Sequence, residues 1–141
     1  MPQITKEYKF CAAHKYWNKS WSEEKNLEVF GEDVRNHGHN YVLRITVEGK
    51  IDPESGFLVD LGWLNRIIKK EVISVLDHCQ IDEDISWFKE KSPSTENLVI
   101  FIWEKISPFF ADKNFSLHKI FIRETPTIFT EYYGPEDGLK K

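Results

Sequence analysis

Two stretches with helical periodicity lie in the middle of this chain, and strand-like stretches flank them on both sides. Residues 3–14 and 39–51 alternate with the two-residue period of a β-strand, and residues 115–134 contain two further β-rich runs. Residues 61–77 and 91–110 instead place apolar side chains at three- and four-residue steps. The order ββ, α, α, ββ predicts an α+β fold, with two helices on one face of a four-stranded antiparallel sheet.

The helical stretches also predict which side chains face the core. Asp60 is a suitable N-cap for the first helix. The expected buried positions are Leu64, Ile67, Ile68, Val72 and Leu76 in the first helix, and Leu98, Phe101, Ile102, Ile106 and Phe109 in the second.

Residues 15–36 have no clean period and are expected to form a long, functional loop. Residues 135–141 are expected to be frayed.

Length and charge limit the class of protein. A chain of 141 residues fits one domain, so we expect residues 1–141 to form a single domain. The net charge of -4 argues against a nucleic-acid partner or an anionic membrane surface. The sequence contains neither a secretory signal pattern nor a membrane-spanning apolar run, and we therefore expect a cytoplasmic protein. Cys11 and Cys79 are far apart and are expected to be thiols.

A His-Gly-His segment, residues 37–39, leads into the second strand-like stretch. Because side chains alternate along a strand, His37 and His39 should point to the same face. His14 ends the first strand and reaches the same end of the sheet if the two strands are neighbours. Three imidazoles without a cysteine ligand suit a catalytic zinc ion with an open fourth position. The alternative is a pair of histidines that are hydrogen-bonded or solvated and bind no metal.

Two further segments contain residues suited to catalysis or binding. Asp77 precedes His78 at the end of the first helix and can orient it for proton transfer, although a polar helix end is the simpler alternative. Glu124 follows Ile120 and Ile122 on one strand face, where an apolar side chain is expected. A carboxylate there can accept two parallel N–H bonds from a guanine or pterin ring, or it can form a salt bridge.

Five ordered motifs, FCAAH, HGHNY, LDH, STENL and RET, resemble the 6-pyruvoyl-tetrahydropterin synthase family, which includes the 6-carboxy-tetrahydropterin synthases. The resemblance spans nearly the whole chain. It implies a tunnelling fold (T-fold), in which trimers close their strands into a β-barrel and two trimers stack into a homohexamer with sites at subunit interfaces. The implied substrate is a pterin, 7,8-dihydroneopterin triphosphate, and the implied cofactor is Zn²⁺.

The resemblance also assigns roles to individual residues. It implies that zinc holds the substrate's side-chain hydroxyls and polarises the developing carbonyl. The implied zinc ligands are His14, His37 and His39, the implied proton-transfer pair is Asp77 and His78, and the implied substrate contacts are Glu124, Glu96 and Thr95. From the residues alone, Thr95 and Glu96 are expected to cap the second helix.

The chain departs from the family at one catalytic position. Most members have a cysteine shortly before HGH, in a pattern like FGKC, whereas this chain reads FGED and has Asp33 there. A register shift would instead place Glu32 at that position. A carboxylate is a weaker base than a thiolate unless burial raises its pKa from about 3.9. Three functions therefore stay open: the pyruvoyl or carboxy chemistry, side-chain cleavage to 6-hydroxymethyl-dihydropterin, and pterin binding without catalysis.

Overall fold

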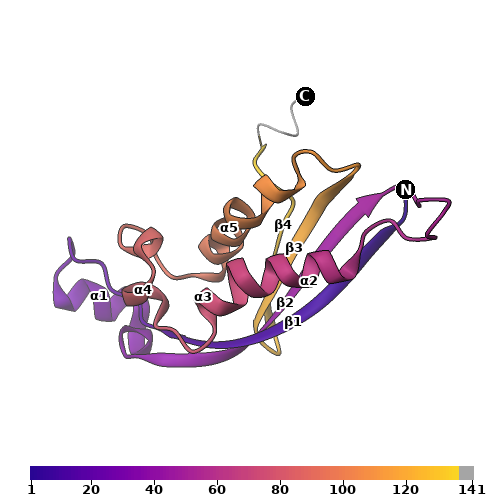
Figure 1. Ribbon diagram of the computed structural model, residues 1–141. Helices are drawn as coiled ribbons and strands as arrows, with labels where there is room; N and C mark the ends of the chain where they lie inside the picture. Colours follow the sequence, from indigo (N-terminus) through magenta and orange to yellow (C-terminus); the bar gives the residue numbers. More distant parts are fainter. Residues whose placement is uncertain (137–141) are drawn as a thin grey trace.

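The computed structural model describes residues 1–136 and contains a four-stranded antiparallel sheet in the order β1-β2-β3-β4 (Figure 1). Its strands are β1 (Gln3–His14), β2 (His37–Gly49), β3 (Phe115–Thr125) and β4 (Ile128–Tyr132). The predicted sheet is confirmed, and β2 begins two residues earlier than expected. Of the tail expected to fray, residues 137–141 lie outside the described part of the chain.

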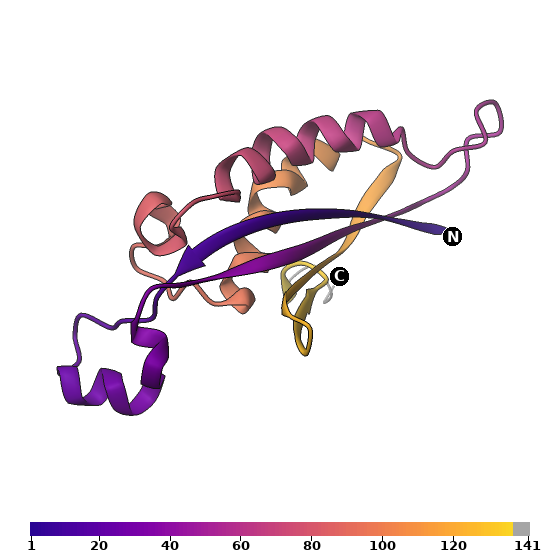
Figure 2. The same cartoon turned by 90° about the horizontal axis from the view of Figure 1, so that it is seen from below.

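Helices cover one face of this sheet, as predicted (Figure 2). The first helical stretch consists of α2 (Leu61–Ile68), a π-helical turn (Lys69–Ile73) and α3 (Ser74–Leu76), and the second consists of α5 (Thr95–Ile106) and a 3-10 turn (Ser107–Phe110). Asp60 caps α2 as expected, because its side chain accepts a hydrogen bond from the backbone N–H of Gly62 at 2.9 Å. The short helix α4 (Ile81–Asp84) and a 3-10 turn (Ser86–Phe88) connect the two stretches and were not predicted.

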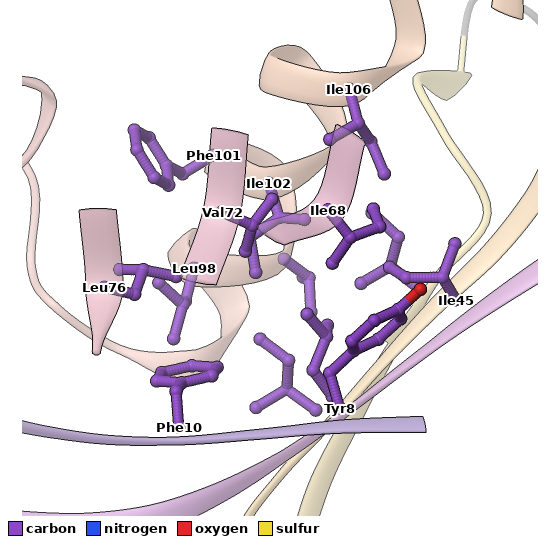
Figure 3. Packing of buried hydrophobic residues seen from close by; sticks show 14 of the residues in the cluster. Tyr8, Phe10, Ile45, Ile68, Val72, Leu76, Leu98, Phe101, Ile102 and Ile106 are labelled. Carbon is purple, nitrogen blue, oxygen red and sulfur yellow. The ribbon is translucent and has the colours of Figure 1, made fainter. Parts of the chain in front are cut away.

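The hydrophobic core lies between the sheet and the two helical stretches (Figure 3). All predicted core positions of the first stretch are buried, and so are four of the five in the second. Phe109 was predicted wrongly, because it is 40% exposed while Phe110 is buried. The change from α-helix to 3-10 geometry after Ile106 alters the rotation per residue, which turns Phe110 inward instead.

The connection between β1 and β2 is more ordered than predicted. It contains α1 (Glu23–Phe30) and a 3-10 turn (Gly31–Val34) at the projecting end of the paired strands (Figure 2). The fully buried Asn26 holds this segment together, because its side chain bonds the backbone N–H and C=O of Asn18 and the C=O of Ser22. A polar network in place of an apolar face explains why the segment has no hydrophobic period.

No helix within residues 1–136 has both the length and the apolar character needed to cross a membrane.

Candidate active site

Three histidines meet at the end of β1 and the start of β2. In the antiparallel register, His14 pairs with His37, and Ala12 pairs with His39. Directly paired residues share a face, and so do residues two apart along a strand, so all three rings lie on the face that packs against the helices. Their ring centroids are 4.6 to 5.2 Å apart, and one ring nitrogen of each lies within 4.8 Å of the other two.

The surroundings of His14 and His37 determine which nitrogen of each ring is free. Nδ1 of the fully buried His14 lies 2.9 Å from the backbone C=O of Pro93, and Nδ1 of His37 lies 2.8 Å from the C=O of Arg35. A carbonyl only accepts hydrogen bonds, so Nδ1 donates in both rings. Nε2 of each ring is therefore left with a free lone pair in the neutral form.

Burial keeps two of the imidazoles neutral at physiological pH. It lowers the pKa of His14 to about 4, and it also lowers the pKa of His39, because the charged ring loses contact with water. Nε2 of His14 is buried and has no hydrogen-bond partner among the described residues. Such an atom is costly to leave unpaired. The three His side chains of this cluster, called here the histidine cluster, therefore fit a divalent cation, which would supply the partner that Nε2 lacks.

Glu124, at the end of β3, closes this site on a third side. Its Oε1 lies 3.4 Å from Nε2 of His14 and 3.3 Å from Nε2 of His39, and its side chain is only 12% exposed. The strand pattern correctly marked Glu124 as an inward-facing carboxylate, but it gave no sign that the histidines would be its neighbours. The carboxylate can act as a metal ligand here or accept hydrogen bonds from a bound ring.

Two tyrosines that the sequence did not single out line the same site. The ring centroid of Tyr16 lies 4.9 Å from that of His14, and the hydroxyl of Tyr41 lies 3.5 Å from Nδ1 of His14. Burial raises the pKa of both phenols well above the usual value, and the nearby carboxylate of Glu124 raises each further. Both phenols therefore stay protonated and can donate a hydrogen bond to a bound anion or oxygen.

Asp33 lies near the outer side of the cluster. Its carboxylate is 3.9 Å from Nε2 of His37, and the side chain is 61% exposed. The backbone C=O of Asp33 accepts a hydrogen bond from the N–H of Tyr16 at 2.9 Å, which ties the 3-10 turn to the site. Among the described contacts, the neighbouring Glu32 shows no such approach to a histidine. Of these two neighbouring acidic residues, Asp33 is therefore the one that approaches the cluster.

The start of α5 adds polar groups to this region. Ser94, and not the expected Thr95, forms the N-cap of α5. The side chain of Ser94 accepts a hydrogen bond from the backbone N–H of Asn97. The hydroxyl of the buried Thr95 contacts the hydroxyl of Thr130 on β4 at 2.9 Å and the carboxylate of Glu96 at 3.0 Å. Thr95 therefore links the helix to the sheet, and Glu96 remains exposed and available for a ligand.

The structure does not bring Asp77 and His78 to the histidine cluster. They follow α3 at the outer edge of β1, where Oδ2 of Asp77 lies 3.0 Å from Nδ1 of His78. The other carboxylate oxygen of Asp77 accepts a hydrogen bond from the backbone N–H of Cys11. This hydrogen bond lowers the pKa of Asp77 below its usual value. His78 is 78% exposed. The ionised Asp77 thus orients an accessible imidazole in a separate part of the chain.

Known proteins resemble this chain both in sequence and in fold. The family model described as 6-pyruvoyl tetrahydropterin synthase matches residues 3–135. A 6-pyruvoyl tetrahydrobiopterin synthase of Drosophila melanogaster is 35% identical, covering 94% of this chain and 79% of the relative. The structure of the Caenorhabditis elegans 6-pyruvoyl tetrahydropterin synthase superposes with a TM-score of 0.85 at 34% identity, covering 96% of this chain and 98% of that one.

A second solved structure shares the fold at lower identity. The Plasmodium vivax 6-pyruvoyltetrahydropterin synthase has a TM-score of 0.62 at 20% identity and covers 94% of this chain and 97% of its own. Its variants, in which a glutamate is replaced by cysteine or alanine, are described as catalytic residue mutants. The resemblance inferred from the five motifs is confirmed by the family model and by the curated relatives. The chain therefore belongs to the 6-pyruvoyl tetrahydropterin synthase family.

Proposed function

We propose that this protein is a zinc-dependent tetrahydropterin synthase that acts on 7,8-dihydroneopterin triphosphate. The observation that carries the proposal is the histidine cluster, with its buried Nε2 atom of His14 lacking a partner. His14, His37 and His39 would hold the ion, so all three protein ligands would be imidazoles. Zinc bound there would act as a Lewis acid on the hydroxyl and carbonyl oxygens of the substrate side chain.

The carboxylate and phenols around the cluster would orient the substrate. Glu124 would accept two N–H bonds from the pterin ring, because its carboxylate is largely shielded from water and has two oxygens. Tyr16 and Tyr41 would donate hydrogen bonds, since their hydroxyls stay protonated. Glu96 and Thr95 would contact the substrate from the start of α5. Each of these groups binds and positions the ring and leaves the proton transfers to other residues.

Proton transfer would use Asp33 together with the Asp77–His78 pair. Asp33 would remove a proton from a side-chain carbon, and His78, oriented by Asp77, would move protons to and from oxygen. Loss of triphosphate with these proton shifts gives the pyruvoyl product and needs no external oxidant. A glutamate of the P. vivax protein is described as a catalytic residue, which supports a catalytic carboxylate in a protein of this fold.

A second reaction deserves a test because Asp33 is a carboxylate near His37, where most members have a thiol. Side-chain cleavage would break the bond between the first and second side-chain carbons, releasing 6-hydroxymethyl-dihydropterin and a two-carbon aldehyde that keeps the triphosphate. A third possibility is a pterin-binding protein without catalysis. Incubating the zinc-loaded protein with 7,8-dihydroneopterin triphosphate, with and without a pterin reductase, and separating the pterins by chromatography distinguishes all three. Absence of turnover on this substrate would contradict both enzyme proposals.

The proposed active enzyme is a cytoplasmic homohexamer built as a dimer of trimers. Two features support the assembly: β1 and β4 are the outer strands of the described sheet, and several large apolar side chains are exposed, among them Leu27, Val29, Ile128 and Phe129. Asp77 and His78 lie at the β1 edge, where a neighbouring subunit would approach. Because Asp77 and His78 lie apart from the histidine cluster of their own chain, we infer that one active site combines the histidine cluster of one subunit with the Asp77–His78 pair of another.

Subunit complementation tests this shared site. Mixed oligomers of His37→Ala and His78→Ala chains, refolded together, should regain activity, because some interfaces would then combine an intact cluster with an intact proton-transfer pair. Each variant alone should be inactive. If the mixture stays as inactive as its components while sedimentation shows mixed hexamers, the shared site is wrong.

A further inference from the structure

Cys11 lies beside Asp77 and His78 in a second group of metal-binding side chains. One donor atom of each residue lies within 4.8 Å of the donors of the other two. Cys11 is at an odd-numbered position of β1, so its thiol points to the opposite face from His14. The group is therefore distinct from the histidine cluster, although both groups draw on the last four residues of β1.

The backbone holds these three residues firmly together. The N–H of His78 donates to the C=O of Cys11 at 2.6 Å, and the N–H of Cys11 donates to the carboxylate of Asp77 at 3.0 Å. The N–H of Ala13 donates a further hydrogen bond to the C=O of Cys79, which continues the attachment along the strand edge. The loop after α3 is thus fixed to β1 on both sides of His78.

His78 has an unusual backbone conformation that contributes to this arrangement. Its φ is +66°, and it is the only residue other than glycine with a positive φ in the described part of the chain. This conformation costs free energy for a side chain with a Cβ, and it persists only where the surroundings impose it. Here the strained turn places the imidazole next to the Asp77 carboxylate and leaves it accessible to a solute.

We propose that Cys11, Asp77 and His78 form a second cation site, which takes a borderline-soft divalent ion such as zinc. A thiolate, an imidazole and a carboxylate are the donors that zinc and cobalt prefer, whereas magnesium and calcium require oxygen ligands. With three protein donors and an exposed histidine, the fourth position is open to water. Partial exposure makes this site weaker than the buried histidine cluster, so it fills second.

Occupation of this second site has a consequence for activity that rests on the proposed function. A bound ion would take the lone pair of His78 and the charge of Asp77, so neither could move a proton. Excess zinc should therefore inhibit an enzyme whose histidine cluster is already loaded. The binding site itself stands on geometry alone and can be tested without any turnover.

Cobalt(II) titration of the metal-free protein tests the site directly. Thiolate coordination produces an intense sulfur-to-cobalt charge-transfer band in the near ultraviolet, which histidine ligands do not produce. The wild-type protein should bind two cobalt ions per chain, and the band should develop with the second. Cys11→Ser should bind one ion and lack the band. Cys79→Ser is the matched control and should retain the band at wild-type intensity.

The outcomes separate this site from the histidine cluster. His37→Ala should weaken the first ion and keep the charge-transfer band, which holds even if the proposed synthase activity is wrong. Circular dichroism of Cys11→Ser should match the wild type, since Cys11 is only partly buried. The proposal is overturned if the wild-type protein shows no charge-transfer band, or if Cys11→Ser keeps the band and the second ion.

Discussion

Replacing Glu124 by glutamine removes one negative charge and keeps the size of the side chain. The carboxylate is 12% exposed, so its bonds to a ligand are largely shielded from water. A pterin ring that donates two N–H groups would find only one accepting oxygen in the amide. Loss of a charge-assisted hydrogen bond costs about 1.5–3 kcal/mol. We therefore expect pterin to bind about 10- to 150-fold more weakly.

The assay is equilibrium binding of a fully oxidised pterin, which cannot react, measured by fluorescence on zinc-loaded protein. Glu131→Gln is the matched control: Glu131 lies on the adjacent strand β4, pairs with Lys119 at 2.8 Å and should not alter pterin affinity. Bound zinc is measured in the same samples. Unchanged pterin affinity in Glu124→Gln would refute the anchor role, and loss of zinc with intact pterin binding would show that Glu124 is a metal ligand instead.

Three other predictions concern catalysis, reactivity and stability. Asp33→Asn should lower turnover about a hundredfold or more while zinc content and pterin affinity are unchanged, and full activity would exclude Asp33 as the base. Burial raises the pKa of the Cys79 thiol to about 11. Alkylation of Cys79 by iodoacetamide, followed by mass spectrometry, should therefore be slow at pH 8 and accelerate as the pH rises toward 10. An alkylation rate independent of pH would contradict this prediction. Ile102→Ala should lower the free energy of unfolding in urea by about 2–5 kcal/mol at matched protein concentration, because Ile102 is fully buried, and a loss below 1 kcal/mol would refute tight packing there.

The strands and the histidine cluster were predictable because strand geometry is regular. Alternation puts His37 and His39 on one face, and antiparallel pairing of neighbouring strands brings His14 to the same end. Both inferences need only local sequence and the assumption that consecutive strands pair. The two long helical stretches were predictable for the same reason, since their apolar period reflects burial against one sheet face.

Other features depend on contacts that no local pattern records. Glu124 reaches the histidines because Arg123 pairs with Val42, and this register between β3 and β2 also includes an irregularity at Thr46 and Val47. The α1 helix was missed because a buried polar residue, Asn26, holds it in place. Asp77 and His78 lie apart from the cluster because their loop attaches to the outer edge of β1. The order of elements along the sequence does not tell to which edge of this strand a loop will attach.

The binding of zinc by the histidine cluster is the central claim, and anomalous diffraction at the zinc absorption edge tests it most directly. Crystals grown with one equivalent of zinc per chain should show an anomalous peak about 2.0–2.1 Å from a ring nitrogen of His14, His37 and His39. His37→Ala crystals should show a weaker peak or none at this position. A wild-type map with no peak among the three rings, or with zinc bound only elsewhere, would contradict the claim.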